Sequence, residues 1–381
     1  MSTQAVADEV TAMEGVEPPG LEFRGVSKRL GDVQAVDDVT LAIREGEFFT
    51  LLVPSGSGKT TSLNLVAGFL AQDDGAILIR GRSVTGLPPE KRDVGIVFQS
   101  YALFPHMSVL DNVAFPLRRR GLKRAEAHAR ARAALELVSL GGREAARPAA
   151  LSGGQQQRAA LARALVFEPK LILLDEPLGA LDRRLRQHLQ EQLRELHRQV
   201  GFTAVYITHD QEEAMALSDR MGIMNEGRLE QVGTGEECYC RPRTLFAANF
   251  LGDANVVPAR VVDAAEEGHC VVRPRDAGAV RAWHPPDRLP GTDVHLIARP
   301  EALEVRRPDA TDDRPVFASG ALHERVFLGQ DVLATVRTPS GEEVVVRERL
   351  HERELHCQVG DAVKVVWGHE ASAVVLPSEA G

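Results

Sequence analysis

Short apolar runs alternate with amphipathic stretches between about residues 21 and 250 of the chain. Each apolar run is only four to six residues long and consists mostly of aliphatic or β-branched side chains. Runs of this kind predict strands that are buried on both faces of a parallel sheet. The predicted strands are Phe48–Val53, Val94–Phe98, Leu171–Leu174 and Ala204–Ile207.

A helix is predicted between the last two of these runs. Apolar residues recur there at spacings of three and four, which gives one apolar helical face with Arg, Gln and Glu outside it. That face consists of Leu185, Leu189, Leu193, Leu196 and Val200. Strands that alternate with helices predict an α/β domain whose ligands bind at the carboxyl ends of the strands.

The pattern changes after about residue 255, where short β-type runs are broken by Gly, Pro and Asp. Turn signals such as Pro339-Ser340-Gly341 recur between them. We therefore predict three parts: a tail at residues 1–20, an α/β domain at 21–255, and a small all-β, OB-like domain at 256–381. The β-type runs are Val271–Val272, Val294–Ala298, Val332–Val336, Glu343–Val346 and Ala362–Trp367.

Composition is that of an ordinary globular protein, with 381 residues, 26% charged and 44% apolar. No stretch approaches the roughly 18 apolar residues of a membrane helix. The net charge of -9 argues against a general nucleic-acid-binding role. Residues 1–20 contain four acidic residues and no Lys or Arg, so we predict a disordered acidic tail rather than a signal peptide. Cys238 and Cys240 are interpreted as ordinary thiols rather than metal ligands.

A phosphate-binding loop is predicted directly after the strand that begins at Phe48. The sequence has the form G-x-x-x-x-G-K-[ST], with Val53 in place of the first glycine. The two later glycines let backbone N–H groups approach phosphates, Lys59 reaches the β- and γ-phosphates, and the Thr60 hydroxyl binds Mg²⁺. The predicted nucleotide-binding residues are Val53, Pro54, Ser55, Gly56, Ser57, Gly58, Lys59, Thr60 and Thr61.

Two further motifs fit the same chemistry. The strand from Leu171 ends in the adjacent carboxylates Asp175 and Glu176. One of them can serve a metal while the other polarises an attacking water molecule. The segment Ser152-Gly153-Gly154-Gln155 predicts a capped helix whose bare N-terminus can bind an anion.

Together these motifs resemble the nucleotide-binding subunit of ATP-binding cassette (ABC) transporters from about Leu21 to Asp253. The resemblance implies a P-loop NTPase cassette with a helical subdomain at about residues 100–165, and ATP and Mg²⁺ as ligands. It implies Asp175, Thr60 and Gln99 at the metal, Glu176 as catalytic base, and His209 as the switch histidine. Gln99 also belongs to the predicted catalytic set.

The same resemblance implies an assembly. Ser152, Gly153, Gly154 and Gln155 match the signature that contacts the nucleotide of a second subunit, and Asp182 lies in the loop that couples the two sites. Partners would be a second copy of the chain, two membrane-spanning permease subunits and, indirectly, a solute-binding receptor, at the cytoplasmic face of the membrane. Residues after Gln99 are expected to contact a permease helix, against the alternative that they are core: Tyr101, Leu103, Phe104, Pro105 and Met107.

The C-terminal segments Arg299-Pro300-Glu301 and Phe327-Leu328-Gly329 resemble the regulatory β domain of importer ATPases. Asp210–Gly233 and Asn249–Asn255 resemble most the spermidine/putrescine branch. Three alternatives stay open: an importer ATPase for ferric iron, sulfate or sugar, an ATP-responsive binding module with little hydrolysis, and a soluble ABC protein of DNA repair or translation. The last usually carries a coiled-coil insert or two cassettes.

Two residues depart from the family pattern at the nucleotide. Leu30 stands where an aromatic residue usually stacks on adenine, and we assign it, with Val36, to the nucleotide site. Val53 raises the question of whether its backbone has a positive φ, which would strain a β-branched residue. We favour a negative φ, because Val53 would then simply extend the preceding strand.

Overall fold

A computed structural model describes residues 18–54, 59–179, 183–264, 268–274, 278–283, 291–310, 314–349, 357–368 and 372–375. The chain divides into two compact units, the first ending at Gly235 and the second beginning at Glu236. The predicted domain boundary at residue 255 therefore lies inside the second unit. Most of the predicted acidic tail lies outside the described residues.

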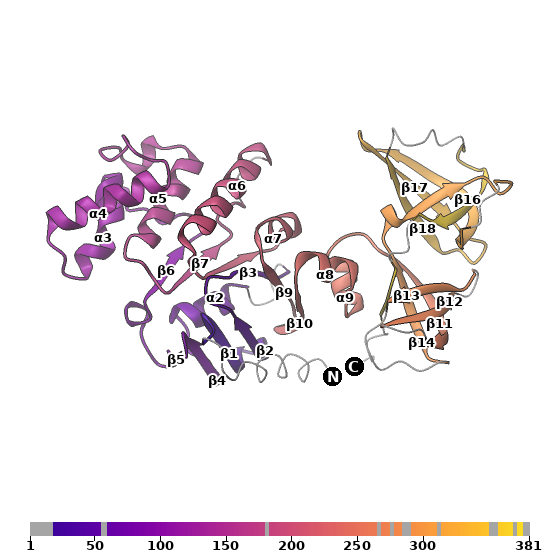
Figure 1. Ribbon diagram of the computed structural model, residues 1–381, viewed down its shortest axis with the longest axis horizontal. Coiled ribbons are helices and arrows are strands. Elements are labelled where there is room, and N and C mark those ends of the chain that lie inside the picture. The colour runs from indigo at the N-terminus through magenta and orange to yellow at the C-terminus, as the bar shows by residue number, and fades with distance from the viewer. Residues whose placement is uncertain are drawn as a thin grey trace. The chain divides into compact units, whose positions relative to one another are not determined.

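A six-stranded sheet forms the centre of the first unit, in the order β10-β9-β3-β8-β7-β6 (Figure 1). Its strands are parallel except for β10, which pairs antiparallel with β9. The predicted apolar runs are all present as strands. The bounds are β3 Phe48–Leu52, β6 Val94–Val97, β7 Leu171–Asp175, β8 Ala204–Thr208, β9 Arg220–Asn225 and β10 Arg228–Gly233.

The two faces of this sheet enter different hydrophobic cores, because successive side chains of a strand point to opposite faces. In β7, Ile172 and Leu174 pack in a core with the helices, whereas Leu171 and Leu173 pack in a core on the other side. Burial on both faces explains why the strand sequences are continuous apolar runs rather than alternating ones.

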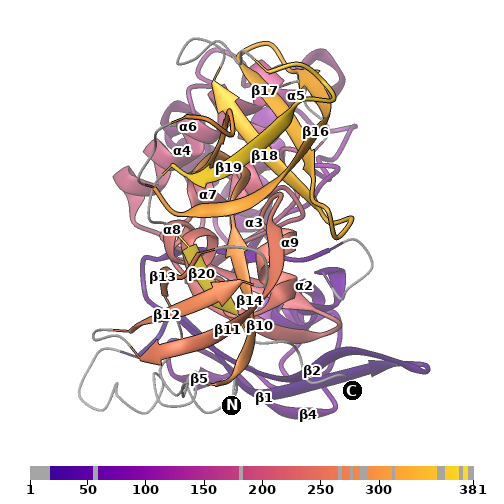
Figure 2. The same ribbon diagram turned by 90° about the vertical axis from the view of Figure 1, so that its right-hand side faces the viewer.

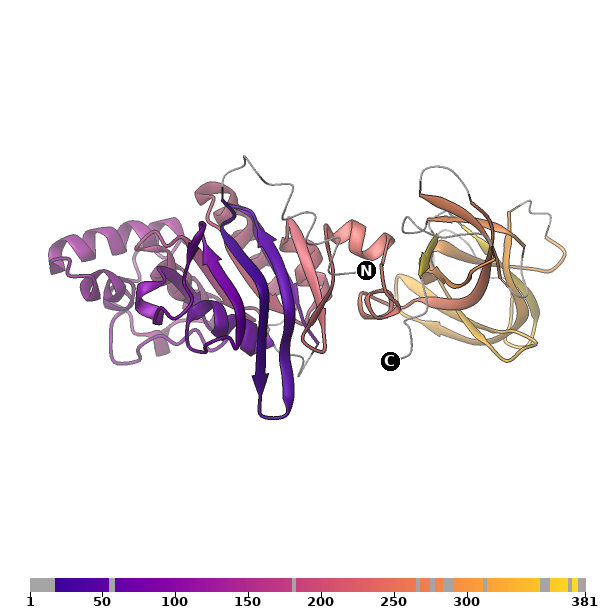
Figure 3. The ribbon, with the colours of Figure 1, turned by 90° about the horizontal axis from the view of Figure 1, so that it is seen from below.

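A second, antiparallel sheet in the order β2-β1-β4-β5 shares the core that contains Leu171 and Leu173 (Figure 3). The same core includes helix α2, which extends over Lys59–Ala67. This helix ends at Ala67, because Gly68 turns the chain with φ +85°. The strands are β1 Leu21–Leu30, β2 Val33–Ile43, β4 Asp74–Ile79 and β5 Arg82–Ser83.

Helices cover the face of the parallel sheet that carries Ile172 and Leu174. Helix α6 contains the predicted apolar face, of which Leu189, Leu193 and Leu196 are buried. Three helices occupy most of the stretch predicted as a helical subdomain. The bounds are α3 Val109–Arg119, α4 Arg124–Leu137, α5 Gly153–Leu165, α6 Arg183–Val200 and α7 Gln211–Leu217, with short 3₁₀ turns at Pro89–Lys91 and Pro148–Ala150.

The second unit opens with helices α8 Gly235–Cys240 and α9 Leu245–Phe250 and is otherwise built from strands (Figure 2). Five strands close a barrel in the order β11-β12-β13-β20-β14, and a five-stranded sheet follows the order β15-β19-β16-β17-β18. Both contribute to one core. Strand bounds are β11 Asn255–Ala264, β12 His269–Pro274, β13 Val280–Trp283, β14 Asp293–Ala298, β15 Leu303–Arg306, β16 Val316–Phe327, β17 Asp331–Arg337, β18 Glu343–Arg349, β19 Ala362–Trp367 and β20 Ser372–Val375, with a 3₁₀ turn at Pro300–Ala302.

Within the described ranges, no helix is both long enough and apolar enough to cross a membrane.

Candidate functional site: a phosphate-loop ATPase centre

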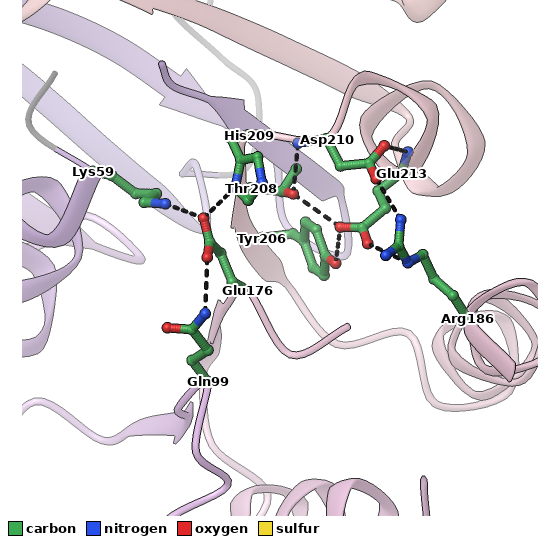
Figure 4. A network of polar contacts seen from close by, with 9 residues as sticks. All are labelled: Lys59, Gln99, Glu176, Arg186, Tyr206, Thr208, His209, Asp210 and Glu213. Atoms are coloured by element: carbon green, nitrogen blue, oxygen red, sulfur yellow. Dashed lines mark hydrogen bonds and ion pairs between the residues drawn. The ribbon is translucent and has the colours of Figure 1, made fainter. Parts of the chain in front are cut away.

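Four predicted site residues meet at one edge of the parallel sheet. Lys59 follows β3, Gln99 follows β6, Glu176 follows β7 and His209 follows β8. These strands are parallel and adjacent in the order β3-β8-β7-β6, so their carboxyl ends lie side by side. Figure 4 shows the four side chains converging from these separate segments.

The carboxylate of Glu176 is the point on which the other three converge (Figure 4). Its Oε1 forms an ion pair with Lys59 Nζ and lies 2.6 Å from His209 Nδ1. Its Oε2 accepts a hydrogen bond of 3.1 Å from Gln99 Nε2. Glu176 is only 7% exposed, so these partners satisfy a carboxylate that water hardly reaches.

The backbone of Glu176 is in an uncommon conformation for a residue with a side chain, with φ at 42°. Its N–H donates to Ile207 O at 3.0 Å, which ties it to strand β8. Strained backbone of this kind persists where the surrounding structure enforces it, typically at functional sites.

The two carboxyls have pKa values shifted in opposite directions. Burial would raise the pKa of Glu176, but the hydrogen bonds from Lys59 and His209 outweigh burial and hold that pKa below its usual value. Burial raises the pKa of Asp175, and the neighbouring charge of Glu176 adds to the increase, while Lys59 opposes it. Glu176 is therefore held as an anion, the form that a general base requires.

The start of the predicted phosphate loop is described, but its centre is not. Val53 is fully buried, its N–H donates to Thr208 O at 3.1 Å, and it is not among the described residues with positive φ. Lys59 and Thr60 begin helix α2, where Thr60 is exposed and Thr61 is buried. Pro54 is half-buried. The remaining loop residues, Ser55, Gly56, Ser57 and Gly58, lie outside the described residues, as does Asp182.

The side chain of Val36, which was assigned to the nucleotide site, lies in the hydrophobic core. It is 1% exposed and packs in the core beside β3, so its side chain offers no surface to a base. Leu30, in contrast, is 44% exposed at the end of β1, where it pairs with Val33 across a tight turn. An exposed leucine can cover one face of a base by apolar contact.

The signature segment starts helix α5 as predicted. Ser152 is the N-cap: its Oγ accepts from Gln155 N, and Gln155 Oε1 accepts from Ser152 N at 3.0 Å. This reciprocal capping leaves the exposed Ser152 at a helix N-terminus suited to an anion. Gly154 is buried, and a Cβ there would make ordinary van der Waals contact with Leu189 of α6 at 3.4 Å, so packing against α6 does not by itself require glycine. Gly153 is half-buried.

The predicted metal ligands suit Mg²⁺. Thr60, Asp175 and Gln99 would provide a hydroxyl, a carboxylate and an amide oxygen, which are hard donors that Mg²⁺ prefers. The described part of the chain contains no group of three or more His, Cys, Asp or Glu residues that could hold a metal ion.

The segment after Gln99 is only partly a surface. Tyr101 is 9% exposed and belongs to the hydrophobic core, so for this residue the core alternative is correct. Leu103, Phe104 and Met107 are half-buried, and Pro105 is exposed. Arg163, which the sequence did not indicate, donates from its guanidinium to the carbonyls of Tyr101 and Ala102 at 2.9 and 2.7 Å.

A lysine at the start of the helix after β3 and a buried glutamate at the carboxyl end of β7, in the same parallel sheet, are typical of a nucleoside triphosphatase of the phosphate-loop class. The "ABC transporter" family model matches residues 36–179, and a "TOBE domain" model matches residues 296–376. The chain belongs to the ATP-binding cassette transporter family, as an ATP-binding ATPase subunit with a C-terminal TOBE β domain. The predicted fold class, ATPase activity and ATP and Mg²⁺ requirement are thereby confirmed.

Similar proteins cover most of the chain. Spermidine/putrescine import ATP-binding protein PotA of Pseudomonas aeruginosa is 45% identical over 360 residues, 94% of this chain and 99% of that protein. PotA of Thermobifida fusca is 42% identical over 98% of each chain. Fe(3+) ions import ATP-binding protein FbpC of Brucella abortus is 45% identical over 88% of this chain and 92% of that protein.

Among solved structures, the dimeric ATP-binding cassette MJ0796 bound to ADP and Pi is 33% identical, with a TM-score of 0.50. The match covers 56% of this chain and 98% of that one.

Proposed function

We propose that the chain powers import of a small solute, a polyamine, by ATP hydrolysis with Glu176 as the general base. The observation that carries the catalytic part is the convergence of Lys59, His209 and Gln99 on the Glu176 carboxylate. In phosphoryl transfer the protein contributes chiefly by positioning and charge, and these groups supply both.

Each residue has a distinct task in this mechanism. Lys59 exchanges its ion pair with Glu176 for the phosphates of ATP, and its charge offsets the negative charge that develops on the γ-phosphoryl group. Glu176 then accepts the proton of the attacking water, while His209, at the carboxyl end of the neighbouring strand β8, holds the γ-phosphate. Mg²⁺ at Thr60, Asp175 and Gln99 supplies charge neutralisation at the phosphates.

A matched pair of variants tests this assignment. Glu176→Gln keeps the shape of the side chain and its contact with Gln99, but removes the base. We expect ATP to remain bound and hydrolysis to slow by about 100-fold or more. Glu191→Gln, an exposed glutamate on α6, is the control and should retain normal turnover. Near-normal turnover of Glu176→Gln would show that another group acts as the base.

We further propose that two copies of the chain form the active assembly, each presenting Ser152 and the N-terminus of α5 to the nucleotide of the other. The solved relative MJ0796 is dimeric, which supports this arrangement. Ser152→Arg places a bulky cation at that helix start and should abolish hydrolysis while each chain still binds ATP. Unchanged hydrolysis by that variant would exclude a site shared between chains.

The proposed solute rests on the relatives, since several are named as spermidine/putrescine import proteins. One relative of similar identity is named for ferric ions, so iron is the second candidate. Vesicles containing the chain and its membrane subunits should accumulate labelled spermidine or putrescine only with ATP, and Glu176→Gln should abolish uptake. Uptake of iron, sulfate or sugar instead would refute the polyamine assignment and leave the ATPase assignment intact.

Contact with the membrane subunits is proposed at a groove beside the segment after Gln99, with the chain peripheral at the cytoplasmic face. The groove is lined by Phe98, Phe104, Phe115 and Phe167, an aromatic surface suited to an apolar helix. Phe104→Ala should reduce co-purification of the membrane subunits while the isolated chain still hydrolyses ATP. Full retention of those subunits would place the contact elsewhere.

A further inference from the structure

A second polar cluster adjoins the catalytic one, on the other side of the segment that carries His209 (Figure 4). Its centre is Glu213 of helix α7, which is 1% exposed. Glu213 Oε2 accepts hydrogen bonds from Tyr206 OH at 2.6 Å and from Thr208 Oγ1 at 2.8 Å. Both donors belong to β8, the strand that leads to His209.

The two neighbours of His209 are both held by this cluster. Thr208 Oγ1, besides donating to Glu213, accepts from Asp210 N at 3.0 Å. The Asp210 carboxylate caps helix α7 by accepting from Glu213 N at 3.1 Å. The side chain of His209 is 51% exposed, so packing alone does not fix its position. Its contact with Glu176 therefore depends on the backbone that these two neighbours hold in place.

An arginine from another helix completes the cluster. Arg186 Nη1 donates to Asp210 Oδ2 at 2.8 Å, and its Nε lies 3.7 Å from Glu213 Oε1. Burial raises the pKa of Glu213, whereas its hydrogen bonds from Tyr206 and Thr208 and the charge of Arg186 favour the anion. Arg186 thus links helix α6 to both acidic residues beside the histidine.

We propose that Arg186 and Glu213 are positioning residues for hydrolysis, which hold His209 against the γ-phosphate and couple its position to that of helix α6. Helix α6 starts at Arg183, directly after the sequence Gly179–Asp182. A shift of α6 would therefore reach His209 through one charge-assisted pair. The inference rests on the proposed role of His209, and neither residue touches the nucleotide in this account.

The test is a kinetic double-mutant cycle in the full chain, with single-turnover hydrolysis of radiolabelled ATP as readout. Arg186→Met removes the guanidinium and keeps the apolar stem. We expect hydrolysis to slow by about tenfold, the equivalent of one charge-assisted hydrogen bond, with ATP affinity unchanged. The melting temperature should fall, because the buried Glu213 carboxylate loses its cationic partner. Arg186→Lys keeps the charge and should recover part of the rate. Arg194→Met, at an exposed position of the same helix, is the control.

The decisive comparison is the same substitution in a His209→Ala background. If Arg186 acts through His209, Arg186→Met should change that residual rate by less than about twofold. An equal loss in both backgrounds, or a weakened ATP affinity, would show a general structural role and overturn the proposal.

Glu213→Gln provides an independent variant, because its amide oxygen can still accept from Tyr206 and Thr208 while its amide nitrogen faces Arg186. It should slow hydrolysis only when His209 is present, and an unchanged rate would also overturn the proposal. If His209→Ala alone hydrolyses ATP at the wild-type rate, the proposed role of His209 fails and this inference with it. If His209→Ala is slow but Arg186→Met is not, only the inference fails.

Discussion

Restoring glycine at Val53 should destabilise the protein rather than improve nucleotide binding strongly. The phosphate-loop pattern has glycine at this position, so Val53→Gly returns the loop to the common sequence. If Val53 were strained by a positive φ, the change would release about 1–3 kcal/mol. Val53 is not among the described residues with positive φ, and its N–H donates to Thr208 O. The strain explanation therefore does not apply.

The magnitude follows from burial. Val53 is fully buried in the core that contains Leu51 and Leu63. Removing a buried valine side chain costs about 1.5–3 kcal/mol, and glycine adds about 0.5–1 kcal/mol of backbone entropy. The expected loss is about 2–4 kcal/mol, which lowers the Tm of a unit of this size by roughly 5–15 °C. The remaining benefit is relief of crowding beside the loop, which we expect to tighten ATP binding only a few-fold.

Thermal unfolding and titration of a fluorescent ATP analogue measure these two effects separately. Val53→Ala is the control, because it removes most of the side-chain volume without adding backbone freedom. We expect it to show most of the Tm loss of Val53→Gly and a similar small change in affinity. Binding that is tenfold or more tighter in Val53→Gly, about 1.4 kcal/mol, together with an unchanged Tm, would refute the reasoning.

Further predictions concern other residues. Leu30→Tyr should tighten ATP binding, since stacking on a base is worth roughly 1–3 kcal/mol and Leu30 is 44% exposed; equal affinity in a nucleotide titration would show that residue 30 does not meet the base. Arg299→Met should lower the Tm of the second unit, because the buried Arg299 donates to four backbone carbonyls there, those of Tyr239, Ala248, Gly252 and Asp253; an unchanged unfolding transition would contradict this. Burial raises the pKa of all three tyrosines, that of Tyr239 to about 12 with the help of Glu301, so the native chain should show little tyrosinate absorbance at pH 10. The unfolded chain ionises first, so stability should fall as pH rises above about 10, and native absorbance that titrates like free tyrosine would contradict the burial.

The convergence of the candidate site's side chains could be expected from the sequence for a simple geometric reason. Lys59, Glu176 and His209 each follow an apolar run, and parallel strands bring all such ends to one edge of the sheet. Strand existence could be predicted because burial on both faces leaves a continuous apolar run. This expectation does not depend on the order of the strands, because any order within a parallel sheet places their carboxyl ends at the same edge.

Other features depend on contacts between distant segments and could not be read locally. Tyr101 was expected to contact a permease helix, because it lies in an apolar and aromatic segment after Gln99. The packing of the helices instead buries it in the core. Val36 lies in a strand whose apolar and polar residues alternate. The alternation does not show which face of the strand is buried, and this is decided only when the two sheets pack together. The ion pair between Arg186 and Asp210 joins helix α6 to the start of α7, and no sequence motif predicts that contact.

The change in sequence pattern and the division into compact units fall at different places for a related reason. Helices α8 and α9 precede the β-type runs. The second compact unit therefore begins before the point at which the sequence changes to short β-type runs. The helices belong to the second unit, where Arg299 of the β domain hydrogen-bonds to the carbonyls of Tyr239 and Ala248. Such a side-chain-to-backbone link leaves no periodic signal.

The most direct test of the central claim is the nucleotide that purified Glu176→Gln retains after incubation with ATP and Mg²⁺. If Glu176 is the base of an ATPase site, the variant should hold unhydrolysed ATP, at about one molecule per chain, while the wild type releases ADP and phosphate. A variant that holds only ADP and turns over as the wild type does would contradict the account.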